Sequence, residues 1–150
     1  MTKMTKFIKT KKKKEIVDIT DLVNQFLKKK MDSGSPDRDP GQAWAGATAG
    51  LVHIFCKHTT CAITTADLDA GGTDQDYLDA FEALMPKLNY RHPHNPDHVV
   101  DHILSSIIGP GVMLPVLEGE LNLGVWQRVV LVELDGPRER EVVLSVIASD

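Results

Sequence analysis

The stretch from residue 89 to residue 106 contains four of the six histidines in the chain, His92, His94, His98 and His102. Imidazole transfers protons near neutral pH and is the commonest side-chain ligand of metals. His98 and His102 are four residues apart, so a helix would place both rings on one face, where they can share a metal ion. The glutamate of the HExxH metalloprotease motif is absent, so this spacing alone does not establish a metal site.

The same stretch reads as a helix from His98 onward, because apolar and polar side chains separate at about 100° per residue. We expect the aliphatic side to pack on a core and the polar side to hold a site in a cleft, since that side has no Lys or Glu. The aliphatic side comprises Val99, Val100, Ile103, Leu104, Ile107 and Ile108. The polar side comprises His98, Asp101, His102, Ser105 and Ser106.

An anion site is the complementary hypothesis. Thr59 and Thr60 offer hydroxyls and backbone N–H groups where a predicted strand is interrupted. Guanidinium groups bind phosphate through two parallel hydrogen bonds. The residues predicted to bind a small phosphorylated ligand are Thr59, Thr60, Arg91, Ser105, Ser106 and Arg138.

These residues must be positioned by a mixture of strands and helices. Strands are expected over 50–56, 61–65, 112–116, 121–124, 126–134 and 141–148, with a further edge strand near residues 7–10. Helices are expected from Thr20 to about Lys30 and from Asp74 to Met85, and a long loop over 31–46. Runs of strands joined by tight turns favour an antiparallel α+β fold over a βαβ fold. The whole chain, residues 1–150, is predicted to be one domain.

Two groups in the C-terminal strands have structural interpretations. We expect Trp126 to be packed and the Gln127 amide to pair with backbone, with pocket lining as the alternative. Glu133 and Asp135 are expected to pair with Arg138 and Arg140 around the Gly136–Pro137 turn.

Composition is that of a globular domain, with 42% hydrophobic and 25% charged residues. No apolar run approaches the roughly 20 residues of a membrane span, and no secretory leader is expected, so no membrane partner and a cytoplasmic location are predicted. Cys56 and Cys61 are expected to be reduced thiols.

Residues 1–30 carry a net charge of +7 and the remainder of the chain carries −11. No aromatic residues interleave the N-terminal lysines, which argues against nucleic-acid binding.

Four segments, in this order, resemble the YjbQ-like family, also called the secondary thiamine-phosphate synthase family. They are HTTCAITTAD at 58–67, NYRH at 89–92, DHILSSIIG at 101–109 and LNLGVWQRVVLVELDGPRER at 121–140. The resemblance extends from about residue 5 to residue 148. It implies an α+β fold with a twisted antiparallel β-sheet sandwich and flanking helices, assembled as a homotrimer. The family name refers to a weak thiamine-phosphate synthase activity, a transfer reaction on phosphorylated metabolites.

The resemblance also implies a polar pocket around His58, His92 and His102. A catalytic zinc site commonly has three protein ligands and one open position. These histidines are therefore predicted as catalytic residues and as ligands of a divalent metal, zinc first and magnesium as the alternative. Asp67 is the predicted catalytic carboxylate, and Trp126 and Gln127 are added to the ligand-binding residues. A polar subunit contact without metal is the competing interpretation of the three histidines.

This chain departs from the family pattern at two motifs. Ala66–Asp67 stands where the family usually has Asn-Glu, and the segment from His94 to His98 adds an imidazole where the family often has Gly and an acidic pair. The main hypothesis is a small trimeric enzyme with a histidine-centred pocket. The alternatives are a metal-assisted hydrolase, a non-catalytic protein that binds metal or phosphate, and a nucleic-acid contact protein.

Overall fold

The computed structural model describes residues 2–31 and 49–148. The loop expected over 31–46 lies almost entirely outside the described residues. The strands are β1 (Thr2–Lys9), β2 (Glu15–Asp18), β3 (Ala49–Cys56), β4 (Cys61–Asp67), β5 (Gly111–Leu117), β6 (Glu120–Leu121), β7 (Gln127–Glu133) and β8 (Glu139–Ala148). The helices are α1 (Thr20–Met31), α2 (Thr73–Leu84), the single 3₁₀ turn η1 (Pro96–His98) and α3 (Val99–Ile108).

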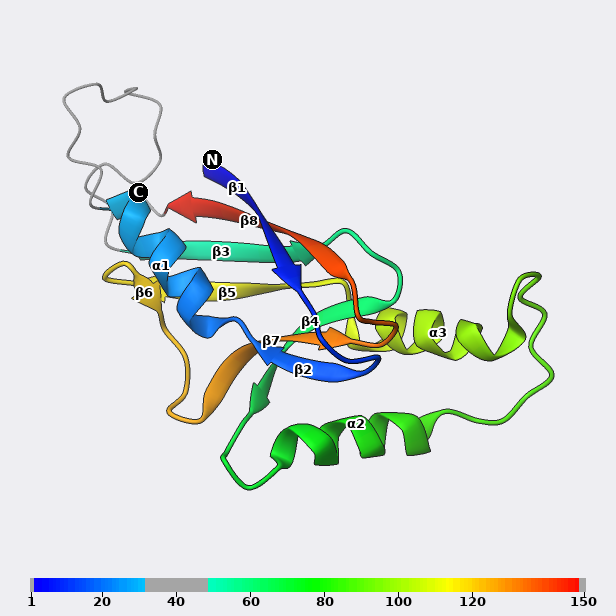
Figure 1. Cartoon of the computed structure of the whole chain (residues 1–150). Coiled ribbons are helices and arrows are strands. Elements are labelled where there is room, and N and C mark those ends of the chain that lie inside the picture. The colour runs from blue at the N-terminus through cyan, green and yellow to red at the C-terminus, as the bar shows by residue number, and fades with distance from the viewer. Residues whose placement is uncertain (1, 32–48, 149–150) are drawn as a thin grey trace.

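The strands form two antiparallel sheets, as Figure 1 shows. Sheet A has the order β1-β8-β3-β5-β6, and sheet B has the order β2-β7-β4. Every strand pair is antiparallel, which confirms the predicted α+β class. Figure 1 shows sheet B below sheet A, with α2 and α3 on its far side and α1 at the end of the sandwich near β6.

Strand β7 explains why the architecture has layers. Its central residues are apolar without interruption, and both of its faces are buried, as in a strand covered on two sides. Val129 and Leu131 belong to the core between the two sheets. Val130 and Val132 belong to a second core beneath the helices α2 and α3. Sheet B is therefore the middle layer, and it connects the helices to sheet A.

Helix α3 forms where the periodicity predicts it, and the predicted division of its faces is right only in part, because Leu104 and Ile108 do pack in the second core. The residues that it buries are Asp101, Leu104 and Ser105, whereas Ile107 is 69% exposed. These three buried positions follow the i, i+3, i+4 spacing of one helix face. The buried face of the helix therefore contains both polar and apolar side chains. The hydroxyl of Ser105 can be buried because it donates a hydrogen bond to the carbonyl oxygen of Cys61 over 2.7 Å.

Helix α1 forms where the sequence predicts a helix, and its Val23, Phe26 and Leu27 are all buried in the core between the sheets. Both cysteines are buried free thiols. Within the described residues, no helix is long and apolar enough to cross a membrane.

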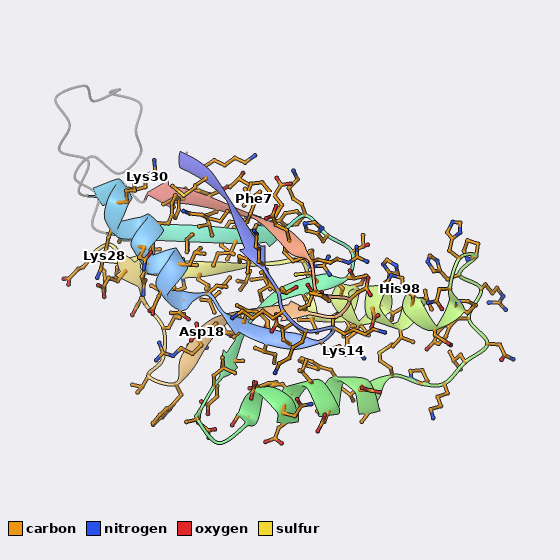
Figure 2. All side chains as sticks on the ribbon, in the orientation of Figure 1. Phe7, Lys14, Asp18, Lys28, Lys30 and His98 are labelled. Atoms are coloured by element: carbon orange, nitrogen blue, oxygen red, sulfur yellow. The ribbon has the colours of Figure 1, made fainter. Side chains whose placement is uncertain are left out.

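The outer face of sheet A carries exposed apolar side chains. In β5 the residues alternate between buried and exposed positions, and the exposed ones include Met113 and Leu117. The register places Leu51 of β3 opposite Pro115 and Ile147. Phe7 of β1, labelled in Figure 2, is 61% exposed. The helices cover sheet B, so this face of sheet A is the uncovered side of the sandwich within the described chain.

Candidate functional site

The turn between β3 and β4 places His58, and β8 fixes its ring. The backbone N–H of Glu141 donates a hydrogen bond to His58 Nε2 over 2.8 Å. Because Nε2 accepts this bond, the neutral ring must carry its proton on Nδ1. Burial, and then the positive charge of Arg140, lower the pKa of His58, so the ring is neutral at physiological pH.

Helix α3 presents His102 to the same turn with the same tautomer as His58 but with the other ring nitrogen engaged. His102 Nδ1 lies 3.1 Å from the carbonyl oxygen of Thr59, and a carbonyl can only accept, so Nδ1 carries the proton. The lone pair of Nε2 is then available to a proton or a metal ion, the arrangement found in many metal-binding histidines. The hydroxyl of Ser106 donates to the carbonyl oxygen of His102 over 3.0 Å. Ser105 and Ser106 therefore both use their hydroxyl protons within the protein.

Three further histidines gather around His102. The ring centroids of His98 and His102 are 4.7 Å apart, and those of His92 and His102 are 5.3 Å apart. His94 lies on the outside of the group, with its ring centroid 6.3 Å from that of His92. The short segment that precedes α3 and the first turn of α3 thus bring together side chains that are adjacent in the sequence.

A cavity of about 450 Å³ lies between the β3–β4 turn, α3 and the β7–β8 turn. Its lining residues are His58, Thr59, Thr60, His98, His102, Asp135, Arg138, Glu139 and Arg140. A neighbouring hollow of about 320 Å³ shares His58, Thr59 and His102 with the cavity and adds Ser105, Ser106 and Pro110. The fold therefore brings His58 and His102 to one polar hollow although they are 44 residues apart.

A buried ion pair forms one wall of the cavity. Arg140 and Glu133 are 2% and 0% exposed, and both carboxylate oxygens of Glu133 accept hydrogen bonds from the guanidinium group. Arg140 also donates to the hydroxyl of Thr60 over 3.0 Å. Burial alone would raise the pKa of Glu133, but the hydrogen bonds from Arg140, the Asp135 N–H and Thr10 outweigh it and lower that pKa.

The β7–β8 turn positions Asp135 and Arg138 at the cavity. Gly136 packs against the connection between β1 and β2, and a Cβ atom there would collide with the carbonyl oxygen of Lys12. Arg138 donates to the Asp135 carboxylate over 2.5 Å. The structure thus confirms the expected pairing of Glu133 and Asp135 with Arg138 and Arg140.

Two carboxylates flank the imidazole of His98, which Figure 2 labels near the start of α3. His98 Nδ1 lies 3.4 Å from Asp101 Oδ2, and Nε2 lies 3.7 Å from Asp135 Oδ2. One ligand atom from each of His98, Asp101 and Asp135 lies within 4.8 Å of the others, a group that can hold a metal ion. Asp101 is buried, and its burial raises the pKa of its carboxyl more than Lys14 and His98 lower it.

The sequence shows part of this group in the i, i+3 spacing of His98 and Asp101, which one helical face brings together. Asp135 is 34 residues away from Asp101 on a turn of another element. The sequence analysis therefore placed Asp101 only on the polar side of the predicted helix and Asp135 only in an ion pair with an arginine. Their approach to His98 follows from the packing of α3 beside the β7–β8 turn.

Five predicted site residues do not line either hollow within the described chain: His92, Asp67, Arg91, Trp126 and Gln127. Asp67 ends β4, where its N–H donates to the Tyr77 hydroxyl, and it pairs in register with Gln127. Asp67 is six residues along β4 from Cys61, about 20 Å away in an extended strand. Trp126 is 72% exposed rather than packed. Arg91 is exposed on the segment before α3.

The sequence matches the family model described as UPF0047 protein YjbQ-like over residues 42–149. A UPF0047 protein of Archaeoglobus fulgidus is 33% identical over 141 residues, which cover 93% of this chain and 97% of the relative. The UPF0047 protein YugU of Bacillus subtilis is 31% identical over 140 residues, covering 93% and 95%. A crystal structure of a YbjQ-like protein of unknown function from Sulfolobus solfataricus superimposes with a TM-score of 0.80 at 30% identity and covers 99% of this chain and 97% of that one.

Proposed function

The chain belongs to the YjbQ-like UPF0047 family, and from this premise we propose that it is a small enzyme acting on a phosphorylated metabolite with the help of a divalent metal ion. One observation carries the proposal: His58 and His102 meet at a polar cavity that also contains Arg138. The cavity of about 450 Å³ has the volume of a small-molecule site.

The anion would bind at the rim formed by Arg138 and the two threonines. Two nitrogens of the Arg138 guanidinium group donate to Asp135, and Nη1 has no hydrogen bond within the described residues. The Thr60 hydroxyl accepts from Arg140 and so keeps its own proton to donate. Thr59 is exposed and adds a second hydroxyl. These groups supply donors for phosphate oxygens without breaking the hydrogen bonds that hold the turn.

The proton-transfer group would be His102. Its Nδ1 proton is fixed by the Thr59 carbonyl, so Nε2 accepts a proton from a substrate hydroxyl or a bound water molecule. His58 would act differently, because its Nε2 already accepts from the Glu141 N–H and its Nδ1–H is the group left to donate. The two rings share one tautomer, but His102 would offer a free acceptor nitrogen and His58 a free N–H donor.

The metal is proposed to be zinc, with magnesium as the alternative, and when bound it would polarise a phosphoryl oxygen or lower the pKa of a water molecule. Of the predicted ligands His58, His92 and His102, the last offers its Nε2 lone pair directly. His58 would have to bind through Nδ1, which moves its proton to Nε2 against the N–H of Glu141. Ligation by the full three-histidine set therefore requires that hydrogen bond to break.

The reaction class separates the competing functions. A transferase would join the pyrimidine diphosphate and thiazole phosphate precursors of thiamine phosphate with release of inorganic diphosphate, whereas a metal-assisted hydrolase would release inorganic phosphate from phosphate esters by attack of water. Purified protein is incubated with both precursors, and separately with a panel of phosphate monoesters, with Zn²⁺ or Mg²⁺. We expect turnover that His102→Gln reduces by about 100-fold or more, while His94→Gln, at the outer edge of the histidine group, retains activity.

Arg138→Gln should raise KM more than it lowers kcat, because it removes a ligand contact rather than a proton-transfer group. Turnover that survives His102→Gln would overturn the assignment of His102. If no compound is turned over but phosphate esters still bind in a manner sensitive to Arg138→Gln, the protein is the non-catalytic binder.

We also propose that the chain assembles as a homotrimer in the cytoplasm. The uncovered apolar face of sheet A, which includes Met113 and Leu117, supports self-association. Asp67, Trp126 and Gln127, at the opposite end of β4 from the cavity, would then contribute to a site only across a subunit boundary. Sedimentation equilibrium should give three times the chain mass, and Met113→Glu should shift it toward the monomer. A monomer at micromolar concentration would refute this assembly.

A further inference from the structure

We propose that His98, Asp101 and Asp135 form a binding site for a divalent transition-metal ion, distinct from the predicted set of three histidines. The three ligand atoms come from η1, α3 and the β7–β8 turn and lie within 4.8 Å of one another. An ion with bonds of about 2.0–2.2 Å holds neighbouring ligand atoms about 3–3.6 Å apart. A contraction of about 1 Å is thus enough to form the site, and side-chain rotation can supply it.

The buried carboxylate of Asp101 is the independent observation that points to a cation. Asp101 is 6% exposed, yet it accepts no hydrogen bond from any group in the described part of the chain. Its nearest cation is Lys14 Nζ at 3.9 Å, and the imidazole Nδ1 of His98 lies at 3.4 Å. A buried carboxylate without hydrogen bonds is costly and calls for a compensating partner. A metal ion supplies that partner through a direct bond.

The surroundings determine which ion fits. One imidazole nitrogen and two carboxylate oxygens suit Zn²⁺, Mn²⁺ or Fe²⁺ better than Ca²⁺, which takes oxygen ligands only. Two cations face the site, Arg138 bound to Asp135 Oδ2 and Lys14 beside Asp101 Oδ1. Both reduce the affinity for a divalent ion. We therefore expect moderate affinity, with Asp135 binding through Oδ1 or after a shift of the Arg138 guanidinium group.

The position of the site gives the ion an open side. His98 and Asp135 line the 450 Å³ cavity, whereas Asp101 lines a different hollow of about 480 Å³ beside Lys13 and Lys14. The ion would sit in the wall between the two hollows and direct its free coordination positions toward the cavity. Water or a ligand oxygen can occupy those positions. The inference concerns metal binding alone and does not depend on the reaction proposed above.

Cobalt titration tests the site, because Co²⁺ replaces Zn²⁺ in such sites and its visible absorption reports ligand number and geometry. The full chain is stripped with chelator, titrated with Co²⁺ and then back-titrated with Zn²⁺. We expect saturable absorption that Zn²⁺ abolishes. His98→Gln and Asp135→Asn should each weaken Co²⁺ binding about 10-fold or more, or lower the stoichiometry by one ion. His94→Gln is the matched control and should bind as the wild type does.

His58→Gln and His92→Gln distinguish the proposed site from the predicted three-histidine set, because both variants should still bind this ion. The proposal is overturned if the unaltered protein shows no saturable Co²⁺ signal. It is overturned equally if binding is lost in His58→Gln and His92→Gln but retained in His98→Gln and Asp135→Asn. Circular dichroism of each metal-free variant checks that it is folded, and His98→Gln is the decisive variant because His98 is half-buried and belongs to neither hydrophobic core.

Discussion

Two carboxylates beside the cavity are almost equally inaccessible, yet their surroundings differ. Glu133 is 0% exposed and receives hydrogen bonds from Arg140, Thr10 and the Asp135 N–H. Asp101 is 6% exposed and has only longer contacts to Lys14 and His98. The pKa of Glu133 is accordingly lowered and that of Asp101 is raised, in both cases after burial has acted to raise it.

The difference separates a carboxylate that serves the fold from one that is proposed to serve a ligand. Glu133 stabilises folding because every lone pair that burial deprives of water finds a donor inside the protein. Asp101 is held in place by α3 with only longer contacts to Lys14 and His98, and this supports the proposal that it binds a metal ion. Substitutions at the two positions should therefore act on different properties.

Arg140→Met should have the largest effect on stability. It leaves the Glu133 charge buried without its principal partner, and removal of one member of a buried pair costs about 3–5 kcal/mol. Urea denaturation monitored by circular dichroism measures the loss in the free energy of unfolding. Arg138→Met on the same turn is the control: its side chain is 55% exposed and should contribute less than about 1 kcal/mol. Equal losses of unfolding free energy in the two variants would show that burial does not determine how much each ion pair contributes to stability.

Glu133→Gln should have an intermediate effect that depends on pH. The folded-state pKa of Glu133 lies below its unfolded value, so its contribution is complete above the unfolded pKa and is lost as the pH falls through the folded pKa. At neutral pH the variant should be about 1–3 kcal/mol less stable than the wild type. The difference should narrow on acidification below the ordinary glutamate range. A difference in unfolding free energy that stays constant with pH would mean that Glu133 does not titrate in this way.

The comparison also shows how much of the molecule the sequence could predict. Alternation and apolar runs predicted the strands of both sheets except the short edge strand β2 (Glu15–Asp18), which the sequence analysis missed, and the pairing around the Gly136–Pro137 turn followed from charges close in sequence. The periodicity predicted α3, but not that its inward face would include two polar residues. Ser105 is buried where its hydroxyl donates to the Cys61 carbonyl of β4, and Asp101 is buried near Asp135 of the β7–β8 turn, and no local pattern encodes those contacts.

The candidate site was predictable to the extent that its members are sequence neighbours. His92, His98 and His102 lie close together because a short segment and one helix carry them. Asp135 could not be added from the sequence, because its place beside His98 depends on how two distant elements pack. Trp126 and Gln127 belong to the same sequence motif as Arg138 and Arg140, but β7 places them at the other end of sheet B.

Asp101→Asn should change stability by less than about 1 kcal/mol in metal-free protein, and in the stabilising direction. The substitution removes a buried charge that lacks hydrogen bonds while keeping the shape of the side chain. Added Zn²⁺ should make the wild type the more stable of the two proteins. It should raise the melting temperature of the wild type and leave that of the variant nearly unchanged, because only a protein that binds the ion in its folded state gains this stabilisation. A variant that loses several kcal/mol without metal would show that Asp101 is already a structural partner of Lys14.

Lys14→Gln should have the smallest effect on stability. It tests the contrast between the two carboxylates by removing the cation beside Asp101 rather than Asp101 itself. Lys14 Nζ contacts both Glu82 at 3.6 Å and Asp101 at 3.9 Å, and its side chain is 28% exposed. Loss of such long contacts should cost about 0.5 kcal/mol. The same change removes a cation that competes with a metal ion for Asp101, so Co²⁺ should bind a few-fold more tightly, and more so at low salt because screening is weaker there. Weaker Co²⁺ binding in this variant would mean that Lys14 holds Asp101 in its ligating position, and the two carboxylates would then differ in degree only.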